Sequence, residues 1–109
     1  MRTAHRLSLV LTRRPVARSG PLAAPLATEV ALEAVLDGDD CPAVAAALAA
    51  AGRLLAGADL TGWFDEPLLP DLARWLAARL VPPASAAGRR LRRVAAASAD
   101  LRCEFHPPQ

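Results

Sequence analysis

Residues 41–57, CPAVAAALAAAGRLLAG, carry the strongest local signal in this sequence. Pro42 is tolerated in the first turn of a helix, and Gly57 is a natural helix terminator. Small alanine side chains let a neighbouring element approach closely, so we expect this helix to lie at the centre of the packing. Its apolar side chains at the spacing of one buried helix face are Val44, Leu48, Ala51 and Leu55.

Helical spacing predicts three further helices, one before this segment and two after it. The first covers about 29–37, with Thr28 as its N-cap and Gly38 as its terminator. Another begins at Pro67 or Pro70 and ends at Val81, because two prolines follow. The last runs from a cap at Ser85 to about Ser98. Their predicted buried side chains are Leu32, Val35 and Leu36; Leu68, Leu72, Trp75, Leu76 and Leu80; and Ala87, Leu91 and Val94.

The two ends of the chain alternate apolar and polar residues, as half-buried strands do. Leu7, Leu9 and Leu11 predict a short strand at about 6–12. A second strand is predicted at the C-terminus, where the apolar positions are Leu101, Cys103 and Phe105. An isolated pair of strands is barely stable, so we expect the two to pair as a ribbon covered by the helices.

The predicted fold is therefore mainly α: a small four-helix domain with short β-strands at the N- and C-termini, α+β only at the margin. We expect one domain over 1–109. Within it, residues 1–27 form an extended, irregular segment, 28–99 a helical core, and 100–109 the C-terminal strand and tail. Leu48, Leu72 and Leu91 should meet in one core.

Composition limits what this domain can be. Hydrophobic residues make up 53% of the chain, but 26 residues are Ala, which buries little surface, so the core should be thin. All 13 basic residues are Arg, and Lys, Asn, Ile and Tyr are absent, as expected of a GC-rich coding sequence. The net charge of +2 is too small to indicate a nucleic-acid partner by itself.

Charge is nevertheless segregated along the chain. Residues 1–28 contain five Arg and no acid, 29–40 contain five acids and no base, and 72–99 contain six Arg and no acid. One interpretation is that these blocks face each other within one fold or face water. The other is that they form a polar interface with a partner.

The densest block is Arg89, Arg90, Arg92 and Arg93 in the last predicted helix. On that helix they form a basic face, which suits nucleic-acid phosphates or an acidic protein surface. No aromatic residue is interleaved to stack on bases, so sequence-specific base recognition is unsupported. The alternative is a solvated face whose Arg content reflects codon use.

Trp63 and Phe64 lie in the most distinctive predicted loop, 59–67. They are predicted either to plug the bottom of the helical core or to anchor a partner. In either case, Trp63→Ala should cost on the order of 3 kcal/mol of stability or affinity.

Candidate metal and catalytic sites are weak. Asp37, Asp39 and Asp40 lack the spacing of a calcium loop and are better explained as helix-capping acids, with Asp39 or Asp40 capping the helix that follows. A zinc site could combine Cys103 and His106 with Cys41 and His5. It is a poor candidate, because alternation puts Cys103 and His106 on opposite sides of a strand. No serine or cysteine has a recognisable base partner. We expect no metal, no cofactor and no catalysis.

Compartment signals are similarly sparse. The acid-free N-terminus has the composition of a transit peptide, but its apolar run Leu7–Leu11 is too short for a secretory signal, and we expect it to be retained. No segment is long and apolar enough to span a membrane. Cys41 and Cys103 are therefore expected to be reduced thiols in a bacterial cytoplasm.

These observations predict a non-catalytic protein–protein interaction or accessory module that uses charge-segregated helical surfaces. A thin core favours gaining burial from a partner, so we expect another protein or the chain itself, as a homodimer. The alternative is a nucleic-acid-associated accessory protein that uses the Arg-rich helix.

Overall fold

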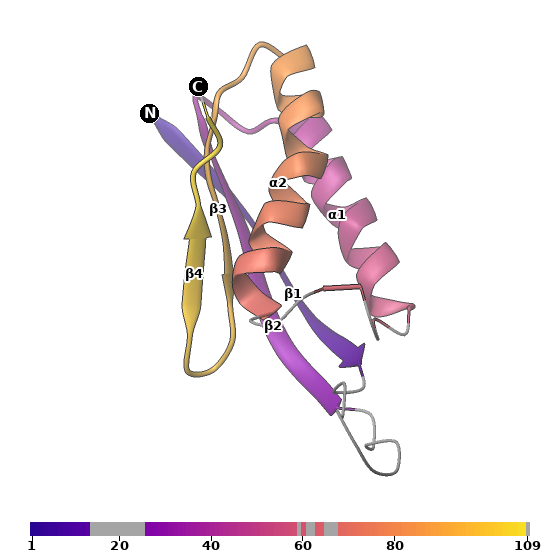
Figure 1. The fold of residues 1–109 in the computed structure, drawn as a ribbon. Coiled ribbons are helices and arrows are strands. Elements are labelled where there is room, and N and C mark those ends of the chain that lie inside the picture. Colours follow the sequence, from indigo (N-terminus) through magenta and orange to yellow (C-terminus); the bar gives the residue numbers. More distant parts are fainter. Residues whose placement is uncertain (14–25, 59, 61–62, 65–67, 109) are drawn as a thin grey trace.

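The computed structural model describes residues 1–13, 26–58, 60, 63, 64 and 68–108 and places two helices on one face of a four-stranded antiparallel sheet (Figure 1). The strands lie in the order β1-β2-β3-β4, so β1 and β4 are the two edges. The elements are β1 (Arg2–Arg13), β2 (Leu26–Asp37), α1 (Pro42–Ala56), α2 (Leu68–Ala86), β3 (Leu91–Ala97) and β4 (Arg102–Phe105).

The prediction of a four-helix domain is wrong, because the first and last predicted helices are the two central strands of the sheet. The segment predicted as the helix 29–37 is β2, and Leu91–Ala97 of the predicted helix that follows Ser85 is β3. The domain is α+β, and the predicted helical core over 28–99 contains only two helices. In β2 the side chains that face the helices alternate strictly along the strand and are fully or almost fully buried: Val30, Leu32, Ala34 and Leu36.

A register shift explains why β3 resembled a helix in the sequence. Leu36 pairs with Leu91 but Val35 pairs with Arg93, so Arg92 is an extra residue in β3. Such a bulge moves the next inward-facing side chain from two residues away to three. The buried residues Leu91 and Val94 are therefore three apart, the spacing of a helix face.

Gly88 was predicted to lie inside a fourth helix, but it ends α2. Its φ is +70°, a left-handed conformation that favours glycine. The N–H of Gly88 bonds to the carbonyl of Ser85, and the N–H of Arg89 bonds to the carbonyl of Ala84. These are the hydrogen bonds of a Schellman C-cap, so the chain leaves the helix here and turns into β3.

The two observed helices correspond to predicted ones but differ at their ends. The helix over residues 41–57 is confirmed as α1, although Cys41, not Asp39 or Asp40, occupies its N-cap position. Helix α2 does not stop at Val81 but continues through Pro82 and Pro83 to Ala86. Both prolines lie in the last five residues, so each removes a single backbone N–H bond near an end that the Gly88 cap stabilises.

Both terminal strands exist, but they do not pair with each other. The N-terminal strand is twelve residues long and pairs only with β2, without a register shift from Arg2 to Arg13. The C-terminal strand pairs with β3, so β2 and β3 separate the two predicted ribbon partners. The irregular segment predicted around Pro15, Gly20, Pro21 and Pro25 lies outside the described residues.

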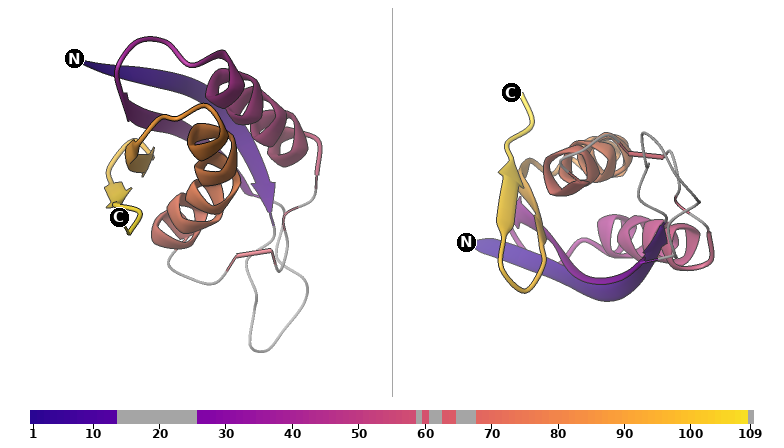
Figure 2. Two further views of the ribbon diagram at one scale, coloured as in Figure 1. Left: turned by 90° about the horizontal axis from the view of Figure 1, so that it is seen from above. Right: turned by 60° about the horizontal axis from the view of Figure 1, so that its bottom comes forward.

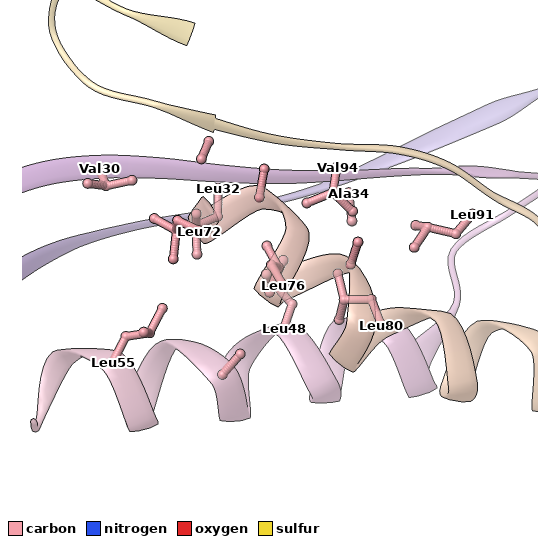
Figure 3. Packing of buried hydrophobic residues seen from close by; sticks show 14 of the residues in the cluster. Val30, Leu32, Ala34, Leu48, Leu55, Leu72, Leu76, Leu80, Leu91 and Val94 are labelled. Carbon is pink, nitrogen blue, oxygen red and sulfur yellow. The ribbon is translucent and has the colours of Figure 1, made fainter. Parts of the chain in front are cut away.

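The core lies between the sheet and the two helices (Figures 2 and 3). Leu48, Leu72 and Leu91 all belong to one buried cluster, which confirms the expectation that they meet. Helix α1 packs on β1 so closely that a Cβ at Gly52 would overlap the side chain of Leu7. A side chain at position 52 would force the end of the Leu7 side chain to shift.

Candidate interaction surface

The face of the sheet opposite the helices, here called the helix-free face, carries charges of both signs. Alternation along each strand directs its polar side chains to this face, and antiparallel pairing places Arg6 opposite Glu33 and Ala95 opposite Glu104. Acidic and basic blocks far apart in the sequence thus become neighbours. The charged residues that interact there are Arg2, Arg6, Glu33, Asp37, Arg92, Arg93, Arg102 and Glu104.

Glu33 is the centre of the first network. Arg6 Nε donates to Glu33 Oε2 at 2.7 Å, and Arg102 Nη2 donates to Oε1 at 3.0 Å. The Glu33 side chain is only 13% exposed. Burial alone raises the pKa of this carboxyl, but the hydrogen bonds and charges of Arg6 and Arg102 outweigh it and hold the pKa below its ordinary value. Glu33 is therefore ionised and held in place at neutral pH.

Glu104 extends this network towards the C-terminus. Arg102 Nη2 lies 3.3 Å from Glu104 Oε1, and His106 Nε2 lies 3.5 Å from Oε2. Arg93 is more distant from both acids, with Nη2 3.8 Å from Glu33 and Nε 4.0 Å from Glu104. Its ion pairs are thus longer than hydrogen bonds.

Asp37 forms the second network, at the end of β2. Arg92 Nε donates to its Oδ1 at 2.7 Å, while Arg2 Nε lies 3.8 Å away. The hydrogen bond from Arg92 lowers the pKa of Asp37 against the opposing effect of burial, and the charges of Arg92, Arg2 and Arg90 lower it further. The carboxylate of Asp37 is thus an ion-pair partner, and no side-chain hydrogen bond caps the N-terminus of α1.

Arg89 uses the backbone of this same segment. Its Nη1 donates to the carbonyls of Asp37 at 3.1 Å and Asp39 at 2.9 Å. Gly38 makes this possible, because its φ is +87° and a Cβ would overlap the Arg89 guanidinium. Arg89 thus joins the loop after β2 to the turn before β3.

The predicted basic helix face does not exist, because Arg89 and Arg90 lie in a turn and Arg92 and Arg93 in β3. Arg92 and Arg93 reach the helix-free face, and Arg89 is bound to the loop carbonyls. Arg90 is exposed and lines a hollow of about 350 Å³ beside the C-terminal end of α2 and Pro107. The structure brings Arg89, Arg90 and Arg92 to the segment 37–40, whereas Arg93 lies near Glu33 and Glu104.

Trp63 and Phe64 lie near α2 with different exposures. Phe64 packs against the core and meets Trp75 edge to face, with ring centroids 5.8 Å apart. Trp63 is 44% exposed, and its ring centroid lies 6.5 Å from that of Phe64. Phe64 therefore contributes to the core, whereas Trp63 presents part of its ring to solvent and remains a predicted partner anchor.

The residues considered for a metal site do not converge. Within the described part of the chain, no group of three or more His, Cys, Asp or Glu side chains could hold an ion. His5 and Cys41 are close, but His5 Nε2 accepts a hydrogen bond from the Cys41 backbone N–H at 3.3 Å. Cys103 belongs to β4 at the opposite edge of the sheet, and both cysteines are free thiols.

The outer edge of β1 is a second feature of this surface. The carbonyl of Met1 points towards β2, where Gly38 N–H donates to it, whereas the carbonyl of Thr12 accepts from Leu60, outside the sheet. Backbone groups alternate in direction along a strand, so odd-numbered residues of β1 bond to β2 and even-numbered ones face outward. From Arg2 to Val10, no described residue bonds to these outward N–H and C=O groups.

Comparison with known proteins adds no relative, because the sequence matches no protein-family model and no curated protein. Among the described residues, no helix has the length and apolar character needed to cross a membrane.

Several residues of this surface were missed in the sequence: Arg2, Arg6, Glu33, Arg102 and Glu104. The available signal was their spacing, because Arg2 and Arg6 alternate with the apolar positions of one predicted strand, and Arg102 and Glu104 with those of the other. Glu33 was hidden because its strand was predicted as a helix.

Proposed function

We propose that this chain is a non-catalytic protein–protein interaction module whose partner is a second copy of itself, joined edge to edge along β1. The observation that carries the proposal is the outer edge of β1, whose outward-facing N–H and C=O groups from Arg2 to Val10 bond to no described residue. An unpaired edge strand is a template for another strand, and soluble proteins usually protect it with short length, proline or a bulge.

The two edges differ in this respect. The C-terminal edge strand β4 has four residues, Arg102–Phe105, and Pro107 and Pro108 follow it. The N-terminal edge strand β1 has twelve, with no proline and no register shift. An edge of this length without a proline or a bulge favours a partner strand.

Charge disfavours some antiparallel registers of two β1 strands and allows others. Outward-facing residues must pair with outward-facing residues, because only these have free backbone groups. A twofold axis at Leu7 places Arg6 opposite Ser8 of the other copy and Arg2 opposite Thr12. An axis at Arg6 places two guanidiniums opposite each other, which is unfavourable.

The experiment is sedimentation equilibrium of the full chain over a range of concentrations, with Ser8→Pro as the test variant. Ser8 N–H faces outward, so proline there removes an edge donor without breaking a bond to β2. We expect a dimer for the wild type and at least about tenfold weaker association for Ser8→Pro.

Ser8→Ala is the matched control, because it loses the same hydroxyl but keeps the N–H, and it should dimerise like the wild type. Circular dichroism should show the same folded state for all three proteins. A wild type that is monomeric at every concentration, or a dimer that survives Ser8→Pro, would contradict the proposal.

Nucleic-acid binding by Arg89, Arg90, Arg92 and Arg93 stays a prediction without a specific supporting contact. Arg89 and Arg92 already hold protein oxygens, and only Arg90 is exposed without a hydrogen bond from its side chain to a described residue. A gel shift with the quadruple Arg→Ala variant tests it: unchanged affinity and salt dependence would rule it out.

A further inference from the structure

A hollow of about 260 Å³ lies on the helix-free face, lined by Arg2, Val35, Arg92, Arg93 and His106. These residues come from the start of β1, the end of β2, the start of β3 and the tail after β4. The start of β1 and the tail after β4 both contribute, because they lie at the same end of the sheet (Figure 1). Four of the five lining side chains are hydrogen-bond donors of the kind that bind oxyanions.

Positive charge exceeds negative charge around this hollow. The two networks contain five guanidiniums and three carboxylates: Arg2, Arg6, Arg92, Arg93 and Arg102 against Glu33, Asp37 and Glu104. The acids are also unevenly shared. Asp37 is hydrogen-bonded by Arg92, and Glu33 by Arg6 and Arg102.

Arg2 and Arg93 are left without a close acceptor. Arg2 Nε lies 3.8 Å from Asp37, and Arg93 Nη2 lies 3.8 Å from Glu33, both too long for a hydrogen bond. Arg93 Nε is buried and has no acceptor among the described residues. A buried donor without a partner is costly, and an oxyanion beside this guanidinium would remove that cost.

We propose that this hollow binds a phosphate group, held by the guanidiniums of Arg2, Arg92 and Arg93 with His106 at its rim. A guanidinium presents paired donors that match two oxygens of a phosphate, and several such forks around one hollow suit its multiple oxygens and charge. The group is either inorganic phosphate or the phosphomonoester of a small molecule. This site goes beyond the proposed self-association, since it uses side chains of the helix-free face, not the backbone edge of β1.

The test is isothermal titration of the full chain with inorganic phosphate and, separately, with glycerol 3-phosphate, at fixed ionic strength. We expect saturable binding to the wild type and about tenfold weaker binding to Arg93→Gln, from the loss of one charge-assisted donor group. Arg2→Gln should weaken binding in the same direction, and its side chain is exposed enough (61%) to leave the fold intact.

Two further variants sharpen the test. Arg53→Gln changes the net charge by the same amount on the exposed side of α1 and should bind phosphate like the wild type. Asp37→Asn removes the carboxylate that competes for Arg92 and should bind phosphate several-fold more tightly.

Stronger binding of glycerol 3-phosphate would identify a phosphomonoester site, and stronger binding of inorganic phosphate a site for the free ion. Absence of saturable binding, equal weakening by Arg53→Gln, or complete replacement of phosphate by chloride at equal ionic strength would overturn the proposal. Because phosphate affinity and oligomeric state are measured separately, either proposal can fail without the other.

Discussion

The helix-covered face and the helix-free face of the same sheet are filled in opposite ways. On the covered face, leucines of α1 and α2 meet the alternate residues of β2 and β3 in one apolar cluster (Figure 3). On the helix-free face, arginines and carboxylates form cross-strand pairs. The free energy of folding should therefore depend mainly on the first face, because burial of apolar groups contributes more than partly exposed ion pairs do.

The helix-free face nevertheless contains buried apolar residues. Val35 and Ala95 belong to it by their register, yet they are 7% and 1% exposed. Neither described helix lies over this face, and long Arg side chains beside Val35 and Ala95 can bury their apolar stems while their charged ends stay near water. Short residues between long charged ones thus give this face some apolar burial together with a surplus of guanidiniums.

Truncation in the covered face should have the largest effect on stability. Leu76 is fully buried in α2, so Leu76→Ala should lower the free energy of unfolding by about 3 kcal/mol. Leu101→Ala is the matched control, because Leu101 is 67% exposed and should change stability by less than about 0.5 kcal/mol. Urea denaturation measures both, and similar losses for the two variants would contradict the observed core.

Charge removal on the helix-free face should have a smaller effect that depends on pH. Glu33→Gln weakens the contacts with Arg6 and Arg102 and should cost about 1 kcal/mol at pH 7. Glu29→Gln is the control, since Glu29 lies on the same face of β2, is exposed and forms no ion pair with a described residue.

The sign of the pH dependence follows from the lowered pKa values of Glu33 and Asp37. A carboxyl with a lower pKa in the folded state stabilises the protein above its unfolded pKa, about 4, and this contribution is lost as pH falls through the folded value. We expect the wild type to lose stability between about pH 5 and 3 and to approach Glu33→Gln there. A difference that persists at pH 3 would show that the ionised carboxylate is not the cause.

The parts of the fold that the sequence predicted are those with one unambiguous period. Cys103 and Phe105 alternate with Arg102 and Glu104 and fit no helical period, and residues 41–57 have helical spacing with a proline and a glycine at the ends; both predictions are confirmed in type. The central strands failed for two physical reasons. Alanine is a strong helix former and is depleted in strands, so the Ala-rich β3 looked helical, and Val35, apolar on the helix-free face, concealed the alternation of β2.

Of the candidate site, only the charged segments could be predicted from the sequence, not the contacts between them. The opposed acidic and basic blocks were visible, and one of their two interpretations, pairing within the fold, describes the contacts of Glu33 and Asp37. Their partners were not visible, because Arg102 reaches Glu33 across β3 although the two residues are 69 positions apart in the sequence. Such contacts follow from strand order, and strand order was lost once β2 and β3 were predicted as helices.

The smallest expected effect concerns Trp63. A fully buried ring would give a loss of about 3 kcal/mol on truncation to Ala, and partial exposure of the ring lowers that expectation. Since 44% of Trp63 is exposed, we expect Trp63→Ala to lower the free energy of unfolding by about 1 kcal/mol or less. Phe64→Ala should cost more, because Phe64 packs against the core and against Trp75. Urea denaturation followed by circular dichroism measures both variants. If Trp63→Ala proved the more damaging of the two, its ring would belong to the core, and it would no longer be a candidate anchor for a partner.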